Sequence, residues 1–71
     1  MLNKTIKYFR TSHKMTQETL ALKLGVTRQT VSKWESGISV PDADTLNKIA
    51  DIFDVSVIDL LGSSELLDEN K

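Results

Sequence analysis

Residues 17–36 read QETLALKLGVTRQTVSKWES, and they carry the most specific structural signal in the chain. Its first half carries leucines at helical spacing and stops at Gly25, because glycine takes the left-handed backbone conformation that ends helices. Only one residue separates Gly25 from Thr27, a residue type that caps helix N-termini, so a second helix follows after a sharp turn. That helix would turn Val31 and Trp34 inward and leave its other flank exposed.

The remainder of the chain keeps the helical spacing of apolar residues, and no stretch alternates with period two. We expect a helix over about residues 2–12, and Thr16 is placed to cap the helix that follows it. Further on, Asp42 can cap a fourth helix, and Ser56 a short fifth one that Gly62 ends. The predicted fold class is therefore all-α, with five short helices.

The length of 71 residues fits one small domain, which hides only about 60% of the surface that its unfolded chain exposes. We expect this domain to cover residues 1–62. Residues 63–71 are predicted to be a polar acidic tail that can contribute to dimerisation. A domain of this size has modest stability or shares its core with a partner.

The sequence lacks the residues that several classes of protein require. Without cysteine and with one histidine, no disulfide, metal site or cofactor is expected. No apolar run approaches the roughly 20 residues needed to cross a membrane, and the start lacks the apolar core of a signal peptide, so we expect a cytoplasmic protein. No carboxylate pair, activated nucleophile or glycine-rich phosphate loop indicates an enzyme.

The formal net charge of -1 hides a strong asymmetry along the chain. Residues 1–40 hold seven Lys and Arg against two Glu, a surplus of five positive charges. Residues 41–71 hold two Lys against eight Asp and Glu, a surplus of six negative charges. The basic half is suited to facing a polyanion while the acidic half turns away, although charged residues in small domains mostly solvate the surface.

The sequence resembles a known family, the Cro and repressor type of helix-turn-helix regulators, also called XRE-like. The resemblance covers about residues 2–61 and is carried by MTQE from Met15, LA from Leu20, LGVT from Leu24, QTVSKWESG from Gln29, Pro41, TL from Thr45 and IA from Ile49. It implies a compact five-helix bundle of the lambda-repressor-like type that binds DNA operators as a two-fold dimer. The third helix would enter the major groove, without catalysis or a metal.

The resemblance also implies which residues would meet the bases, namely Arg28, Gln29 and Ser32. The chemistry agrees, because Arg can bind a guanine and Gln an adenine through two hydrogen bonds each, whereas Ser is short enough to serve several bases. The alternative for Arg28 is an ordinary solvated charge.

A second set of residues is expected to hold the DNA backbone. Gln17 would bind phosphate from the start of the second helix, as the resemblance implies, with a simple helix-start residue as the alternative. Lys33 is a candidate for another phosphate, with a solvated surface charge as its alternative. The loop around Gly37 and Ser39 can bring backbone N–H groups to the next phosphates. These contacts would position the recognition helix without reading sequence.

Two further predictions concern the body of the domain and its surface. The resemblance implies a structural ion pair between Arg10 and Glu35, with a phosphate contact as the alternative for Arg10. Candidates for a dimer interface are the apolar residues at the end of the chain, Val57, Leu60, Leu61 and Leu66. The alternative, in which Leu60 and Leu61 complete the core of one protomer, is equally open at this point.

The sequence therefore predicts a transcriptional regulator, most simply a repressor, that binds double-stranded DNA at a near-palindromic operator as a homodimer. One alternative is an antitoxin or anti-regulator that acts mainly through a protein partner and its acidic C-terminal half. Another is that the chain is the DNA-binding part of a longer regulator.

Overall fold

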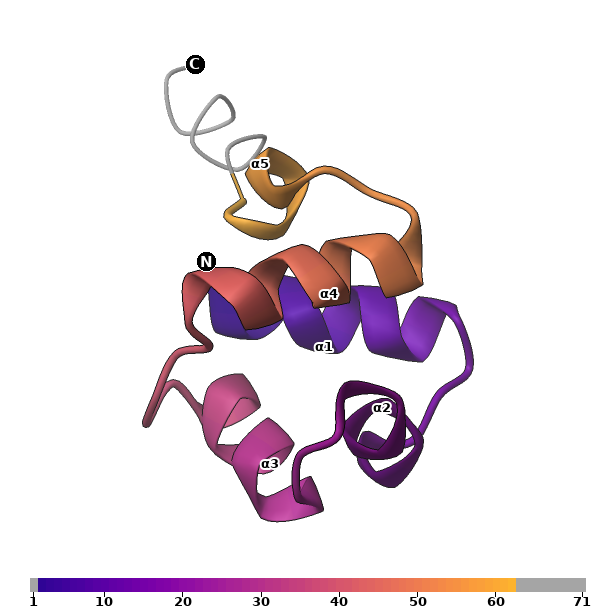
Figure 1. The fold of residues 1–71 in the computed structure, drawn as a ribbon, viewed down its shortest axis with the longest axis vertical. Coiled ribbons are helices and arrows are strands. Elements are labelled where there is room, and N and C mark those ends of the chain that lie inside the picture. Colours follow the sequence, from indigo (N-terminus) through magenta and orange to yellow (C-terminus); the bar gives the residue numbers. More distant parts are fainter. Residues whose placement is uncertain (1, 63–71) are drawn as a thin grey trace.

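The computed structural model describes residues 2–62, and the regular structure in that range is entirely helical. Figure 1 shows the five helices, α1 (Leu2–Ser12), α2 (Gln17–Leu24), α3 (Arg28–Ser36), α4 (Ala43–Phe53) and α5 (Val57–Leu60). The predicted all-α fold with five short helices is confirmed, with helix ends within about one residue of those expected. None of the described helices is long and apolar enough to span a membrane.

Short polar side chains define where four of these helices begin. Thr16, Thr27, Asp42 and Ser56 each stand in extended backbone just before a helix, and each side chain accepts a hydrogen bond from the N–H three residues later. Such a bond satisfies one of the N–H groups that have no partner inside the helix. At Ser56 the bond is reciprocal, because the Asp59 carboxylate accepts from the Ser56 N–H at 3.2 Å.

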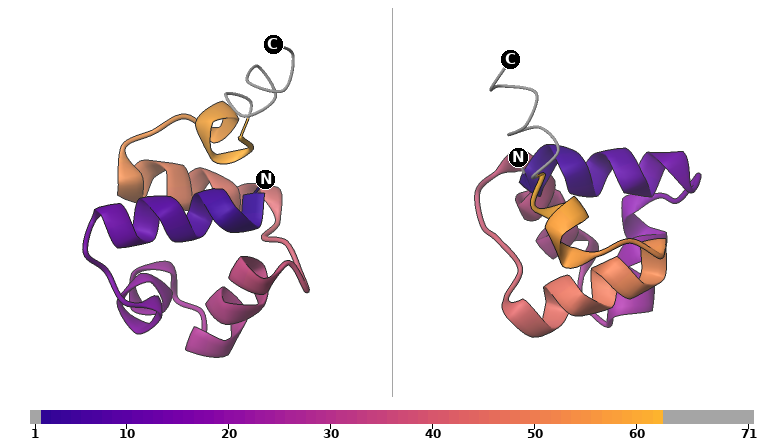
Figure 2. Two further views of the ribbon diagram at one scale, coloured as in Figure 1. Left: turned by 180° about the vertical axis from the view of Figure 1, so that it is seen from behind. Right: turned by 90° about the horizontal axis from the view of Figure 1, so that it is seen from above.

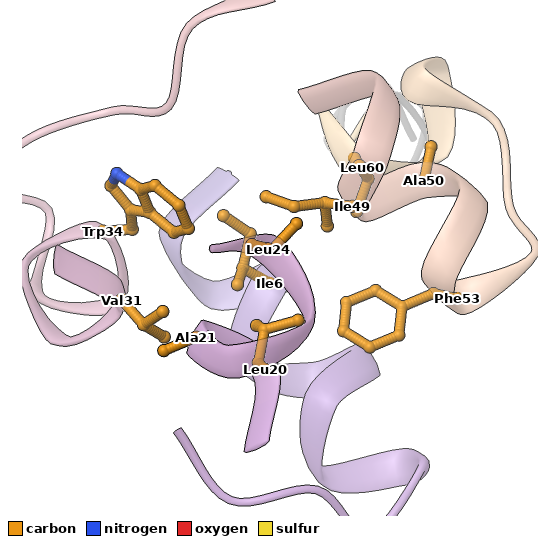
Figure 3. Close-up of a cluster of buried hydrophobic side chains, with 10 residues drawn as sticks. All are labelled: Ile6, Leu20, Ala21, Leu24, Val31, Trp34, Ile49, Ala50, Phe53 and Leu60. Carbon is orange, nitrogen blue, oxygen red and sulfur yellow. The ribbon is translucent and has the colours of Figure 1, made fainter. Parts of the chain in front are cut away.

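The helices surround one apolar core to which all five contribute (Figure 3). In Figures 1 and 2, α2 and α3 lie on one side of α1 and α4, and α5 lies on the other side. The core residues are Ile6, Leu20, Ala21, Leu24, Val31, Trp34, Ile49, Ala50, Phe53 and Leu60. At the edge of the core, the ring of Phe9 stacks on Phe53 with centroids 6.0 Å apart.

Leu60 holds the short helix α5 to the rest of the domain. A helix of four residues is not stable alone, and complete burial of one leucine contributes about 1.5–3 kcal/mol. Leu60 has no exposed surface, whereas its neighbour Leu61 is 49% exposed. The prediction of Leu60 as a dimer contact is therefore corrected, because its side chain completes the core of the protomer.

A buried ion pair joins α1 to α3. The Arg10 guanidinium donates to both carboxylate oxygens of Glu35, at 2.6 Å and 3.0 Å, and to the carbonyl oxygen of Met15 at 2.7 Å. The two side chains are only 10% and 4% exposed. Three hydrogen bonds thus fix the α1–α2 connection and the last turn of α3 relative to α1.

Replacing Glu35 with Ala should strongly destabilise the domain. The substitution leaves the buried Arg10 charge without its carboxylate, and removal of one partner of a buried pair costs about 3–5 kcal/mol. Chemical denaturation would measure this loss, which is a large share of the roughly 5–15 kcal/mol typical of a domain. Glu18→Ala, at an exposed glutamate of α2, is the matched control and should cost less than about 1 kcal/mol. Equal losses for both variants would contradict a structural role for the pair.

The cap at Asp42 should make part of the stability depend on pH. Hydrogen bonds from the side chain and backbone N–H of Thr45 hold the pKa of Asp42 below its ordinary value, and Lys48 adds to this effect. Because the folded pKa is the lower one, the stabilisation is present above the ordinary pKa near about 3.9 and is lost as the pH falls through the folded value.

Asp42→Asn keeps a capping side chain that cannot titrate. The difference in melting temperature between wild type and this variant should therefore shrink as the pH is lowered below about 4. Thermal unfolding followed by circular dichroism across this range measures the difference, and a difference that stays constant with pH would refute the assignment.

Candidate nucleic-acid interface

The turn between α2 and α3 brings the two helices together at a close crossing. Gly25 adopts left-handed backbone with φ 74°, and its N–H bonds back to the carbonyls of Ala21 and Leu22. The N–H of Val26 donates to the Ala21 carbonyl at 3.0 Å, and Thr27 then caps α3. Ala21 is almost fully buried, and its small side chain allows the close approach. This geometry is a helix-turn-helix.

The outer side of α3 presents four polar side chains together. A shallow surface depression is lined by Arg28, Gln29, Ser32 and Lys33. Three of these are exposed and Ser32 is half-buried, while Val31 and Trp34 on the opposite side of the helix enter the core. The depression therefore offers two cations together with an amide and a hydroxyl that can each donate and accept hydrogen bonds.

Gln17 connects this surface to the buried ion pair. Its amide nitrogen donates to the Glu35 carboxylate at 3.0 Å, and its amide oxygen lies 3.5 Å from Nη1 of Arg28, at the limit of hydrogen bonding. Because a carboxylate only accepts hydrogen bonds, the amide must turn its oxygen toward Arg28. Gln17 is the first residue of α2, so it stands at the positive end of that helix.

The loop after α3 differs from the prediction in one respect. The Gly37 N–H bonds to carbonyls of α3, those of Lys33 and Trp34, and the Ser39 N–H lies 3.4 Å from the Lys33 carbonyl oxygen. These N–H groups close the end of the helix, as in other helices that end at a left-handed glycine. The predicted phosphate contact through the Gly37 N–H is therefore corrected, and the contact predicted at Ser39 stays a prediction.

Three features near this surface were not singled out from the sequence. Ile38 and Val40 are 74% and 72% exposed on either side of Ser39, where β-branched residues in a loop gave no signal of their own. The side chain of Asn3 lies against Gly37, such that a Cβ at the glycine would be 3.7 Å from the Asn3 amide nitrogen. The first turn of α1 therefore lies beside the end of α3.

The apolar residues of α5 are divided between core and surface. Val57 is half-buried against the core, whereas Leu61 and Ile58 are 49% and 64% exposed. Ile58 was not named individually among the predicted interface residues, although it lies between two that were, Val57 and Leu61. Leu66, also a predicted dimer contact, lies outside the described residues.

Comparison with known proteins places this geometry in a family. The family model described as helix-turn-helix matches residues 6–60. The transcriptional activator BcrR of Enterococcus faecalis is 40% identical over 65 residues, which are 92% of this chain and 32% of BcrR. An uncharacterised helix-turn-helix transcriptional regulator of Methanocaldococcus jannaschii, MJ0272, is 47% identical over 60 residues, 84% of this chain and 89% of that protein.

Among solved structures, the biofilm regulator SinR in complex with DNA superposes with a TM-score of 0.79 at 32% identity, over 86% of this chain and 98% of SinR. The chain thus spans about a third of BcrR and nearly all of the SinR chain. The family match extends from α1 to α5 and includes the close crossing of α2 and α3, which confirms the resemblance seen in the sequence. The chain belongs to the helix-turn-helix family of Cro and repressor type.

Proposed function

We propose that this protein binds double-stranded DNA in a sequence-specific manner and regulates transcription. The observation that carries the proposal is the set of four polar side chains on the outer side of α3, a helix whose inner side is fixed by the core and by the Arg10–Glu35 pair. The SinR structure, a complex with DNA at 32% identity, supports the same function. Binding alone can exclude other proteins from a promoter, so repression is the simplest mode.

In this function, the N-terminal half of α3 reads bases in the major groove. Arg28 would donate two hydrogen bonds to O6 and N7 of a guanine, and Gln29 would pair with N6 and N7 of an adenine. Ser32 lies one turn further and would accept or donate at a neighbouring base. Each two-bond contact contributes roughly 1–3 kcal/mol of discrimination.

Contacts to phosphate would fix the position of α3. Gln17 would bind phosphate from the start of α2, where the free end of the helix attracts anions, and Lys33 would do so from α3. Ser39 would add its hydroxyl. The surplus of five positive charges in residues 1–40 supports this orientation, because release of counterions from DNA favours binding by a basic surface.

The proposal includes a homodimer. One α3 reaches only a few base pairs, whereas two copies about 34 Å apart would contact successive major grooves of a near-palindromic operator. The exposed apolar side chains of Ile58 and Leu61, beside the half-buried Val57, support an interface around α5. In this arrangement residues 1–62 form the DNA-binding domain, and the polar acidic tail, residues 63–71, contributes Leu66 to the dimer.

Two substitutions should separate base reading from backbone binding. Arg28→Ala should relax the preference at one base pair, whereas Lys33→Ala should weaken binding to all sequences about equally and lower the salt dependence. Selection of bound fragments from random DNA would first identify the operator. Fluorescence-anisotropy titrations on variants of that operator then measure both effects. Uniform losses for both variants would exclude base reading by Arg28, and a wild-type affinity that does not change between 50 and 200 mM salt would contradict the proposed function.

The dimer makes a separate prediction at Leu61. Leu61→Asp places a charge in the proposed interface and should raise the dimer dissociation constant by at least about tenfold, equivalent to about 1.4 kcal/mol. Sedimentation equilibrium measures the constant. Leu22→Asp is the matched control, because Leu22 on α2 is also an exposed leucine, 74% exposed against 49% for Leu61. The α5 interface is refuted if both variants dimerise like the wild type.

A further inference from the structure

The face of α1 that lies beside α3 carries an exposed lysine, Lys7. Asn3, Lys7 and Arg10 stand at positions i, i+4 and i+7 of α1 and therefore form one strip along the helix. Asn3 lies against Gly37 at the end of α3, and Arg10 bonds to Glu35 in its last turn. Lys7 comes between two residues that both contact α3, and it is exposed.

Within residues 2–62 the structure gives the Lys7 ammonium group no ion pair, and the carboxylate in the last turn of α3, that of Glu35, is bound by Arg10 and Gln17. Residues 1–40 contain only one other acidic residue, Glu18 on α2. Lys7, a cation on a flexible stem, thus stands where α1 lies beside the last turn of α3, and this boundary between the two helices is called the seam below.

The seam is where a DNA backbone would pass if α3 occupies the major groove. An α-helix with its side chains is about 10–12 Å wide and the groove about 12 Å, so the helix fills the groove and its flanks face the bordering phosphates. The N-terminal residues of a recognition helix reach the bases, so its C-terminal end lies toward the backbone. Asn3 and Lys7 lie beside that end.

We propose that α1 is part of the nucleic-acid interface, with the Lys7 ammonium binding a DNA phosphate and the Asn3 amide supporting it from the preceding turn. This inference rests on the proposed function and extends it to a helix outside the helix-turn-helix. The contact carries no sequence information and adds to affinity on every duplex.

Salt dependence tests the proposal directly. Each lost phosphate contact reduces the slope of log affinity against log salt concentration by roughly 0.9. Lys7→Ala should therefore lower the slope by about that amount per protomer, measured by fluorescence anisotropy on a mixed-sequence duplex of roughly 30 base pairs between 50 and 200 mM salt. Lys7→Arg, which retains the charge, should restore the wild-type slope.

Lys48→Ala on α4 is the matched control, an exposed lysine in the acidic half of the chain, and it should leave the slope unchanged. Equal thermal midpoints for all variants would show that folding is intact. If the wild type binds with a steep slope and Lys7→Ala has the same slope, this inference is overturned while the proposed function stands. If the wild type shows no salt-dependent binding at all, the proposed function itself fails.

Discussion

The ion pair between Arg10 and Glu35 fixes how α1, α2 and α3 are placed relative to one another. It joins α1 to α3, holds the α1–α2 connection through the Met15 carbonyl, and is joined by Gln17 at the start of α2. Because either charge alone would be buried without compensation, arrangements in which α3 is rotated or shifted are strongly disfavoured. In a domain with a small core, van der Waals contacts alone leave the orientation of α3 adjustable. The ion pair removes this freedom and so determines the orientation of α3.

The consequence is that α3 has three functions on three sides. Val31 and Trp34 anchor it in the core, Glu35 fixes its rotation, and the remaining side carries Arg28 and Ser32 outward. A helix of nine residues is too short to be stable in isolation, so its order comes from the contacts on the first two sides. Preorganisation of this kind lowers the entropy that would be lost on binding a rigid partner such as duplex DNA.

Much of this fold was predictable because its signals are local. Capping residues lie immediately before four helices, and leucine spacing identifies α2. Other features were not local. The choice between Leu60 and Leu61 for the core depends on how α5 is oriented. Lys14 and Asp54 stand in left-handed backbone at the ends of α1 and α4 although neither is glycine, so their residue types gave no sign of this conformation. The pairing of Arg10 with Glu35, 25 residues apart, followed from the family resemblance and from no spacing rule.

The environment of each charge determines what salt can change. Arg10 is paired with a carboxylate and shielded from solvent, so dissolved ions screen its interaction little. Arg28 is exposed, and its contact at 3.5 Å with Gln17 constrains it only weakly. Because Arg28 is exposed, salt would screen its interaction with DNA, with a Debye length of about 8 Å at physiological ionic strength. Salt therefore affects the buried Arg10 pair little, whereas the attraction of the exposed Arg28 to a polyanion depends on ionic strength. Raising the salt concentration would release the DNA from a recognition helix that keeps its position.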